Sequence, residues 1–186
     1  MAIKLIVTLL KKRGVEGLKV IETERLALRK LSIEDSPFIL ELLNDPLWLR
    51  FIGDKGVRTL DDARSYIVNS PLSMYERLGF GLYLTELKDS YTPIGLCGLL
   101  KRDDLEDVDI GFAFLPQFRG KGYAYEAALA VMEYGRTVLG KQRIVAITST
   151  DNNASAKLLI KLGFKFKKII SLPGDDEQLM LFTFDS

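Results

Sequence analysis

The sequence predicts one α/β domain (α+β in layout), built on a central mixed sheet of about seven mostly antiparallel strands with helices on both faces. Three observations predict this. The 186 residues are enough for one domain with a sizeable core. Hydrophobic residues make up 47% and charged residues 27%, which is typical of a globular chain. The expected order of elements is β-α-α-β-β-β-α-β-α-β-β, and its runs of neighbouring strands favour a mixed sheet over a doubly wound one.

The first elements carry clear local signals. Residues 25–29 alternate in polarity with period two, which predicts a strand. Ser32 can cap a short helix, which the Asn-Asp-Pro sequence at 44–46 ends. Thr59 can cap a second helix, because two aspartates follow in its first turn, where the helix dipole favours acidic side chains.

The later elements alternate between strands and helices. A long helix from about Lys121 to Val138 carries an apolar stripe and is followed by Gly140, a typical helix stop. A shorter helix at 153–162 ends at Gly163. We expect a closing hairpin around Pro173 and Gly174. The strands expected in this part of the chain are 80–87, 94–100, 109–115, 143–148, 164–170 and 178–184.

Residues 20–186 are expected to form the domain, with residues 1–19 as an N-terminal extension. The apolar run at 1–10 is followed by three basic residues, whereas a signal peptide places its charge before the apolar run. The run is also too short to span a bilayer. We therefore expect no membrane partner. The single cysteine, Cys97, cannot form a disulfide within the chain, which fits a cytoplasmic protein.

The composition excludes several kinds of site. The chain has no histidine, so a Ser-His-Asp triad and a Cys-His nucleophile pair are both ruled out. Zinc sites built from His and Cys cannot form either, and we expect no metal. The 26 basic and 25 acidic residues nearly cancel, so net charge gives no reason to expect nucleic-acid binding.

The segment at 117–124, Gln-Phe-Arg-Gly-Lys-Gly-Tyr-Ala, follows a strand and opens the long helix. Gly120 and Gly122 allow a tight turn and a close backbone approach to a ligand. The first amides of a helix are unpaired and the helix dipole adds positive potential, so this turn can bind phosphate or pyrophosphate. Arg119 and Lys121 add positive charge. Spacing alone leaves an ordinary glycine-rich turn equally open, and neither the P-loop nor the dinucleotide pattern is present.

This segment resembles the acetyl-CoA signature Q/R-x-x-G-x-G/A of the GNAT superfamily of N-acetyltransferases, with Gln117, Gly120 and Gly122 in the matching positions. Residues 110–116 resemble the central strand of that family, and residues 151–164 resemble its N-x-x-[AS]…K-x-G-F block. Two such matches, about thirty residues apart with a strand and a helix between them, are a specific signal.

The resemblance covers nearly the whole chain. Residues 21–29, with their Thr-Glu-Arg-Leu sequence, are typical of the branch that contains the ribosomal-protein N-acetyltransferases. The resemblance implies acetyl-CoA as co-substrate and a central strand that splays from its neighbour. It further implies that free backbone groups on that strand bind the pantetheine arm, that residues 119–124 hold the pyrophosphate, and that Asn152 contacts acetyl-CoA. The residues implied to bind it are Phe112, Ala113, Phe114, Arg119, Gly120, Lys121, Gly122, Tyr123, Ala124 and Asn152.

The catalytic residues are less firmly indicated. Many family members carry a tyrosine near the thiol, and Leu159 stands in that position here. Ser155 matches a serine proposed as proton donor in the ribosomal-protein branch, although a small helix residue that packs or caps locally remains an alternative. Asp109 is a candidate base or amine anchor on the central strand, and a solvated strand-edge carboxylate is the alternative. A water chain could also accept the proton. We expect Glu86 and Glu177 to be solvated and Trp48, Tyr75 and Cys97 to lie in the core.

The acceptor is a primary amine. The ribosomal-protein resemblance favours the α-amine of a protein, which also has the lower pKa, near 8 rather than the 10.4 of lysine. A small amine such as a polyamine, amino acid or drug stays open, because residues 38–73, where acceptor specificity is expected, contain no recognisable motif. A catalytically idle acyl-CoA-binding module is a further alternative, supported by the missing tyrosine. We expect a monomer or a homodimer.

Overall fold

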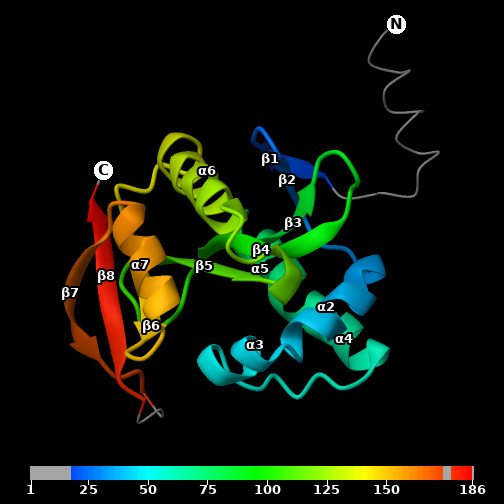
Figure 1. Cartoon of the computed structure of the whole chain (residues 1–186), viewed down its shortest axis with the longest axis horizontal. Coiled ribbons are helices and arrows are strands. Elements are labelled where there is room, and N and C mark those ends of the chain that lie inside the picture. The colour runs from blue at the N-terminus through cyan, green and yellow to red at the C-terminus, as the bar shows by residue number, and fades with distance from the viewer. Residues whose placement is uncertain (1–17, 174–176, 186) are drawn as a thin grey trace, which may run out of the picture.

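The computed structural model describes residues 18–173 and 177–185. One eight-stranded sheet runs through the molecule in the order β1-β2-β3-β4-β5-β6-β8-β7 (Figure 1). Every neighbouring pair is antiparallel except β5 and β6. The strands are β1 (Lys19–Glu22), β2 (Leu26–Arg29), β3 (Leu82–Leu87), β4 (Pro93–Leu100), β5 (Val108–Phe114), β6 (Arg143–Ser149), β7 (Lys165–Ile170) and β8 (Leu179–Asp185).

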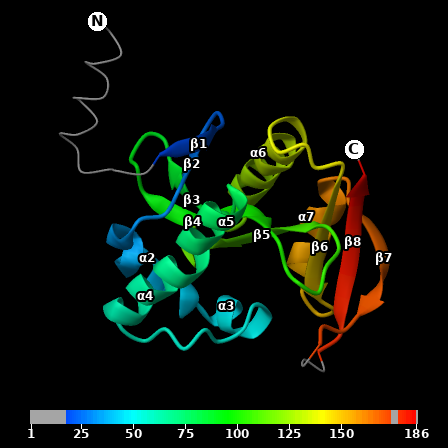
Figure 2. The ribbon, with the colours of Figure 1, turned by 180° about the vertical axis from the view of Figure 1, so that it is seen from behind.

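Helices cover the sheet, as the sequence predicted. One group comes from the segment between β2 and β3, and Figure 2 shows it lying together, away from the two later helices. The first group is α2 (Ser36–Leu43), α3 (Pro46–Phe51), α4 (Leu60–Ile67) and α5 (Ser73–Leu78), and the later helices are α6 (Tyr123–Thr137) and α7 (Asn153–Lys161). Helix α6 packs on β4 and β5, and α7 packs on β6 and β7.

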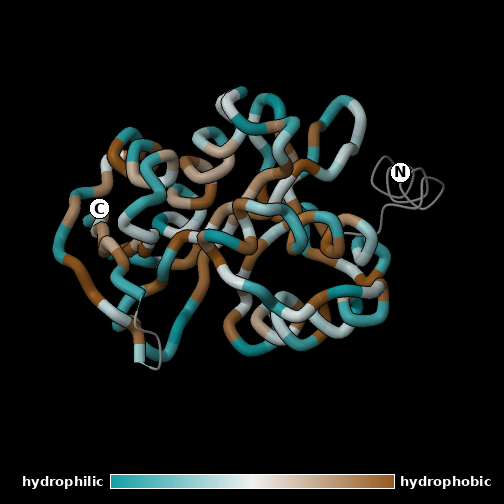
Figure 3. Tube along the Cα trace, turned by 60° about the horizontal axis from the view of Figure 1, so that its bottom comes forward, coloured by the Kyte–Doolittle hydropathy of each residue, from teal (hydrophilic) through white to brown (hydrophobic). Residues whose placement is uncertain are grey.

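The core lies between these layers and contains most of the predicted apolar positions. Brown, hydrophobic stretches follow the strands and recur along the helices (Figure 3). Tyr83, Leu84 and Leu96 on the central strands are almost completely buried. Trp48, Tyr75 and Cys97 are buried as expected. Thr59 caps α4 with a capping box as expected, whereas the capping box of Ser32 begins a three-residue 3₁₀ turn (Ile33–Asp35) that leads into α2.

Three elements were not predicted. The expectation of seven strands missed β1, whose four residues give too little alternation to read. Helices α3 and α5 were also missed. Asp45 and Pro46 were interpreted only as the end of α2, whereas the Asp45 side chain caps α3 and Pro46 occupies its first turn. The predicted turn at Gly174 lies outside the described residues.

The pairing of β5 is what creates a site. On one edge, β5 pairs with β4 up to Phe114. On the other edge it pairs with β6 only at Val108 and Asp109. Beyond that point the two parallel strands diverge, so the sheet opens into a V toward their C-terminal ends. Helices α6 and α7 begin after those ends, and the two helix N-termini therefore lie at the open end of the V.

Candidate active site

The open edge of β5 presents two residues to the V. The amide of Leu115 donates to the carbonyl of Ile94 on β4, at 2.9 Å. Backbone groups of an antiparallel strand alternate between its two edges, so those of Ala113 also face β4. The groups of Phe112 and Phe114 then face the V. This narrows the predicted pantetheine-binding groups from three residues to two.

The turn before α6 has the geometry that the glycines predicted. Gly120 and Gly122 have φ angles of +73° and +82°, a backbone region that residues other than glycine rarely adopt. The first helical bond runs from the Glu126 amide to the Gly122 carbonyl, at 3.1 Å. The amides of Tyr123 and Ala124 precede that bond and so lack an intrahelical acceptor. The turn and the helix dipole together suit a pyrophosphate.

Side chains from the β1–β2 turn hold this structure in place. Arg25 donates from Nη1 to the Lys121 carbonyl at 3.1 Å and from Nε to Glu126 Oε2 at 2.6 Å. Thr23 Oγ1 donates to Glu126 Oε1 at 2.6 Å. Burial by itself would raise the pKa of the Glu126 carboxyl, but these donors lower it below its ordinary value. The Thr-Glu-Arg-Leu sequence thus anchors α6, whereas Glu126 was not predicted because it lies about a hundred residues away.

Arg119 does not extend its side chain into solvent beside the turn. Its Nη2 atom lies 2.5 Å from Asp45 Oδ1, and its Nε donates to the Phe114 carbonyl at 2.8 Å. Its backbone belongs to the turn, while its charge is directed at the start of α3. Lys121 therefore remains a cation at the turn: its side chain is exposed, and its Nζ lies over the Phe118 ring, 5.7 Å from the ring centroid.

The opposite arm of the V carries Asn152 and Ser155. Asn152 Oδ1 accepts a hydrogen bond from the Ser155 amide at 3.1 Å and so caps α7. The structure therefore brings these two predicted residues together at one helix N-terminus. Ser155 is half-buried. Leu159, in the position of the family tyrosine, is buried in the core.

Asp109 lies at the vertex of the V, where the pairing of β5 and β6 ends. It is 1% exposed, so the alternative of a solvated strand-edge carboxylate was wrong. Arg102 Nε donates to its Oδ2 at 2.9 Å. Its Oδ1 is buried and has no hydrogen-bond partner among the described residues. Burial raises the pKa of this carboxyl, and Arg102 only partly offsets that effect.

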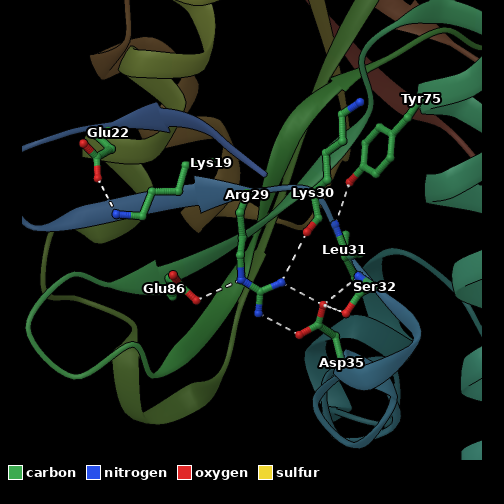
Figure 4. Close-up of polar contacts among 9 residues, drawn as sticks. All are labelled: Lys19, Glu22, Arg29, Lys30, Leu31, Ser32, Asp35, Tyr75 and Glu86. Atoms are coloured by element: carbon green, nitrogen blue, oxygen red, sulfur yellow. Dashed lines mark hydrogen bonds and ion pairs between the residues drawn. The ribbon is translucent and has the colours of Figure 1, made fainter. Parts of the chain in front are cut away.

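The other two acidic residues behave differently from each other. Glu86 was expected at the surface, but it is buried beside Arg29, with Nε and Oε2 3.1 Å apart (Figure 4). Asp35 pairs with the same guanidinium at 2.7 Å, so Arg29 gathers both carboxylates. This cluster belongs to the packing of β2 and β3. Glu177 is exposed as expected and accepts a hydrogen bond from Ser149 Oγ at 2.5 Å.

The surface is hollowed beside the turn. A cavity of about 470 Å³ is lined by residues of the β1–β2 turn, of α6 and of α7, among them Arg25, Gly122, Tyr125 and Lys161. It adjoins the positive end of α6. No group of three or more potential metal ligands occurs among the residues that the structure describes. None of the described helices is both long and apolar enough to cross a bilayer.

These groups together can bind an anionic, amide-bearing ligand. Helix amides and Lys121 suit its phosphates, and the open edge of β5 can pair with its amides as a strand would. The Ser155 hydroxyl can donate a proton and the Asp109 carboxylate can accept one, and the two residues belong to the two strand–helix units that form the V. Acyl transfer from a thioester uses a proton donor, a proton acceptor and backbone hydrogen-bond donors of this kind.

Comparisons with known proteins agree with that chemistry. A family model described as an acetyltransferase (GNAT) domain matches residues 25–165. Two proteins of Bacillus subtilis described as uncharacterized N-acetyltransferases, YnaD and YoaA, are 30% and 29% identical to the chain. Each alignment covers 81% of this chain, and the alignments cover 87% of YnaD and 85% of YoaA. Among solved structures, RimL, a ribosomal L7/L12 α-N-protein acetyltransferase in complex with coenzyme A, superposes with a TM-score of 0.75 at 18% identity, over 88% of this chain and 95% of its own.

Proposed function

The chain belongs to the GNAT acetyltransferase family, and on that premise we propose that this acetyl-CoA-dependent N-acetyltransferase acts on the N-terminal α-amine of a protein. The observation that carries the proposal is the nature of the candidate base, a buried carboxylate at the vertex of the V. Even with a raised pKa, a carboxylate is a weak base toward a lysine ammonium of pKa near 10.4. An α-ammonium of pKa near 8 needs far less help, because part of it is already neutral at physiological pH.

The description of one structural neighbour supports the same acceptor. RimL, which superposes at 18% identity, is described as a ribosomal L7/L12 α-N-protein acetyltransferase. At such identities the likeness supports the fold, and the acceptor is a proposal for this chain.

We assign acetyl-CoA to the turn and to the open edge of β5. The amides of the turn and the side chain of Lys121 hold the pyrophosphate, and Asn152 contributes from the opposite arm. The backbone groups of Phe112 and Phe114 pair with the pantetheine arm, and one of their amides donates to the thioester oxygen as negative charge develops there.

We assign the proton transfers to Asp109 and Ser155. Asp109 takes the proton of the acceptor amine through its unpartnered Oδ1, directly or through water, or anchors that amine. The amine lone pair then attacks the thioester carbonyl and the carbon–sulfur bond breaks. Ser155 donates its hydroxyl proton to the leaving thiolate, whose conjugate acid has a pKa near 8.5, and takes up, directly or through water, the proton that the amine nitrogen releases as the amide forms.

A panel of acceptors tests the proposal. The protein is incubated with acetyl-CoA and three matched acceptors: a peptide with a free α-amine and blocked lysines, the same peptide with a blocked α-amine and free lysines, and a set of small amines. Mass spectrometry locates the acetyl group, and we expect it on the α-amine. Transfer to small amines alone would make the protein a small-molecule acetyltransferase. Acetyl-CoA binding without any transfer would identify a non-catalytic module.

A further inference from the structure

The start of helix α3 is tied to the acetyl-CoA turn by one ion pair. Asp45 Oδ1 accepts from the amides of Leu47 and Trp48, at 3.1 and 3.2 Å, and thereby begins the helix. The same oxygen lies 2.5 Å from Arg119 Nη2. The Asp45 side chain is 4% exposed, so Arg119 balances a charge that water does not reach.

Arg119 also holds the open edge of β5. Its Nε donates to the Phe114 carbonyl, one of the groups that face the V. A single guanidinium therefore joins the phosphate turn, the pantetheine edge and Asp45, the N-cap of α3. An ion pair that only stabilised α3 would have no need of this third contact.

A second ion pair fixes α3 to the other arm of the V. Arg50 near its end lies 2.7 Å from Asp151, which immediately precedes the α7 cap. Both side chains are more than half exposed, so this pair contributes little. In Figures 1 and 2, α3 is the helix of the first group that lies nearest to β6. It thus spans the V, with its stronger attachment on the acetyl-CoA arm.

We propose that Arg119 is a positioning residue that couples acetyl-CoA binding to the placement of α3, and through α3 to the acceptor site. A pantetheine amide that pairs with the β5 edge competes with Arg119 for the Phe114 carbonyl. Loss of that bond frees the guanidinium to reorient, and the contact with Asp45 transmits the change to the first turn of α3. The proposal rests on acetyl-CoA occupying the turn and the β5 edge, as assigned above.

The chain contains a reporter for this coupling. Trp48 is the only tryptophan of the chain. It lies in α3, and its backbone amide donates to Asp45 Oδ1. Trp48 emission is followed while acetyl-CoA is titrated, with free N-acetyltryptophanamide as the correction for absorption by adenine. Calorimetry measures the acetyl-CoA dissociation constant in parallel, so that occupancy and response are known separately.

We expect a saturable change in Trp48 emission in the wild-type protein. Two variants remove one partner of the pair: Arg119→Gln, and Asp45→Asn, which keeps an oxygen to cap α3. In each, the amplitude of the emission change should fall at least about threefold. The acetyl-CoA dissociation constant should change by less than about fivefold, which is the low end of coupling between sites. Arg136→Gln, which removes an arginine from an exposed pair on α6, should respond as the wild type does. Circular dichroism checks that each variant is folded.

Removing one partner of a buried pair can unfold a protein, so the double variant Arg119→Gln/Asp45→Asn, which removes both charges, is included. The double variant should be folded and unresponsive. A wild-type emission that does not move at saturating acetyl-CoA, or that moves equally in folded Arg119→Gln and double variants, would overturn the coupling. Absence of any acetyl-CoA binding heat in the wild type would instead overturn the assignment of acetyl-CoA to the turn.

Discussion

The two sides of the V differ in how they are built. On the side that we assign to acetyl-CoA, the proposed ligand-binding groups are backbone amides, placed by Gly120 and Gly122 within one continuous segment. On the side that we assign to the acceptor, α3 contacts the rest of the molecule through ion pairs between distant residues. Arg119 lies 74 residues from Asp45, and Arg50 lies 101 residues from Asp151.

That difference explains what the sequence could predict. A backbone site needs glycine at fixed spacing, so the turn could be predicted from the residues themselves. The open strand before it and the role of the Asn152 block were implied only by the family resemblance. A site made from long-range pairs leaves no local pattern, so α3 and the Asp45–Arg119 contact could not be predicted. Burial also depends on the whole fold, which is why Glu86 was expected at the surface and why a solvated Asp109 remained an alternative to the candidate base.

The largest expected effect is a loss of acetyl-CoA affinity caused by a change at the turn alone. Gly122→Val places a β-branched residue at a φ of +82° and a side chain at the surface that the pyrophosphate approaches. We expect acetyl-CoA affinity to fall at least about a hundredfold, since backbone approach to the phosphates is lost. Calorimetry measures this.

The matched control is Gly140→Val, because Gly140 also has a positive φ, +65°, and lies beyond the other end of α6. It should cost similar stability and leave acetyl-CoA affinity unchanged. Equal affinity losses in both variants would mean that general strain, rather than a ligand at the turn, explains the result.

The next effect concerns the arm opposite the turn. If Ser155 protonates the leaving thiolate, Ser155→Ala should lower kcat roughly a hundredfold and leave the acetyl-CoA dissociation constant nearly unchanged. Steady-state kinetics with the acceptor found in the panel, together with calorimetry, separate the two quantities. Ser155→Thr, which keeps a hydroxyl, should recover part of the rate. An alanine variant with wild-type kcat would leave Ser155 with a packing role only.

Asp109→Asn should lower kcat/KM by about tenfold or more, and the loss should depend on pH. Burial raises the Asp109 pKa, so wild-type kcat/KM should rise as pH increases through that pKa, and the variant should lack this rise. Stability should change in the opposite sense. A buried carboxyl with a raised pKa stabilises the fold at low pH, and this contribution disappears as pH rises through the folded-state pKa.

The melting temperature of Asp109→Asn, relative to that of the wild type, should therefore increase as pH rises. A raised KM with unchanged kcat would identify Asp109 as an amine anchor. Identical pH profiles for wild type and variant would show that water, not Asp109, accepts the proton.

The smallest expected effect tests the side-chain support of the acetyl-CoA side. Glu126→Gln weakens the bonds to Thr23 and Arg25 and should cost about 1 kcal/mol, or roughly 2–4 °C in Tm, after allowance for solvent at Arg25. The folded-state pKa of Glu126 is lowered, so its contribution is present above its ordinary pKa, near 4.3, and is lost as pH falls through the folded value. Calorimetric melting across that range measures it. A difference in Tm that persisted unchanged at low pH would show that the charge of Glu126 does not act as described.

The central claim is that acetyl-CoA lies against the backbone of the turn and the open edge of β5. Amide chemical shifts measured during an acetyl-CoA titration test this most directly, because they report on backbone groups one by one. We expect the largest shifts at Phe112, Phe114 and residues 120–125, and smaller ones at Ala113, whose backbone faces β4. Shifts concentrated instead around a second hollow of the described surface, which Lys101 and Arg143 line, with the turn unchanged, would contradict the account.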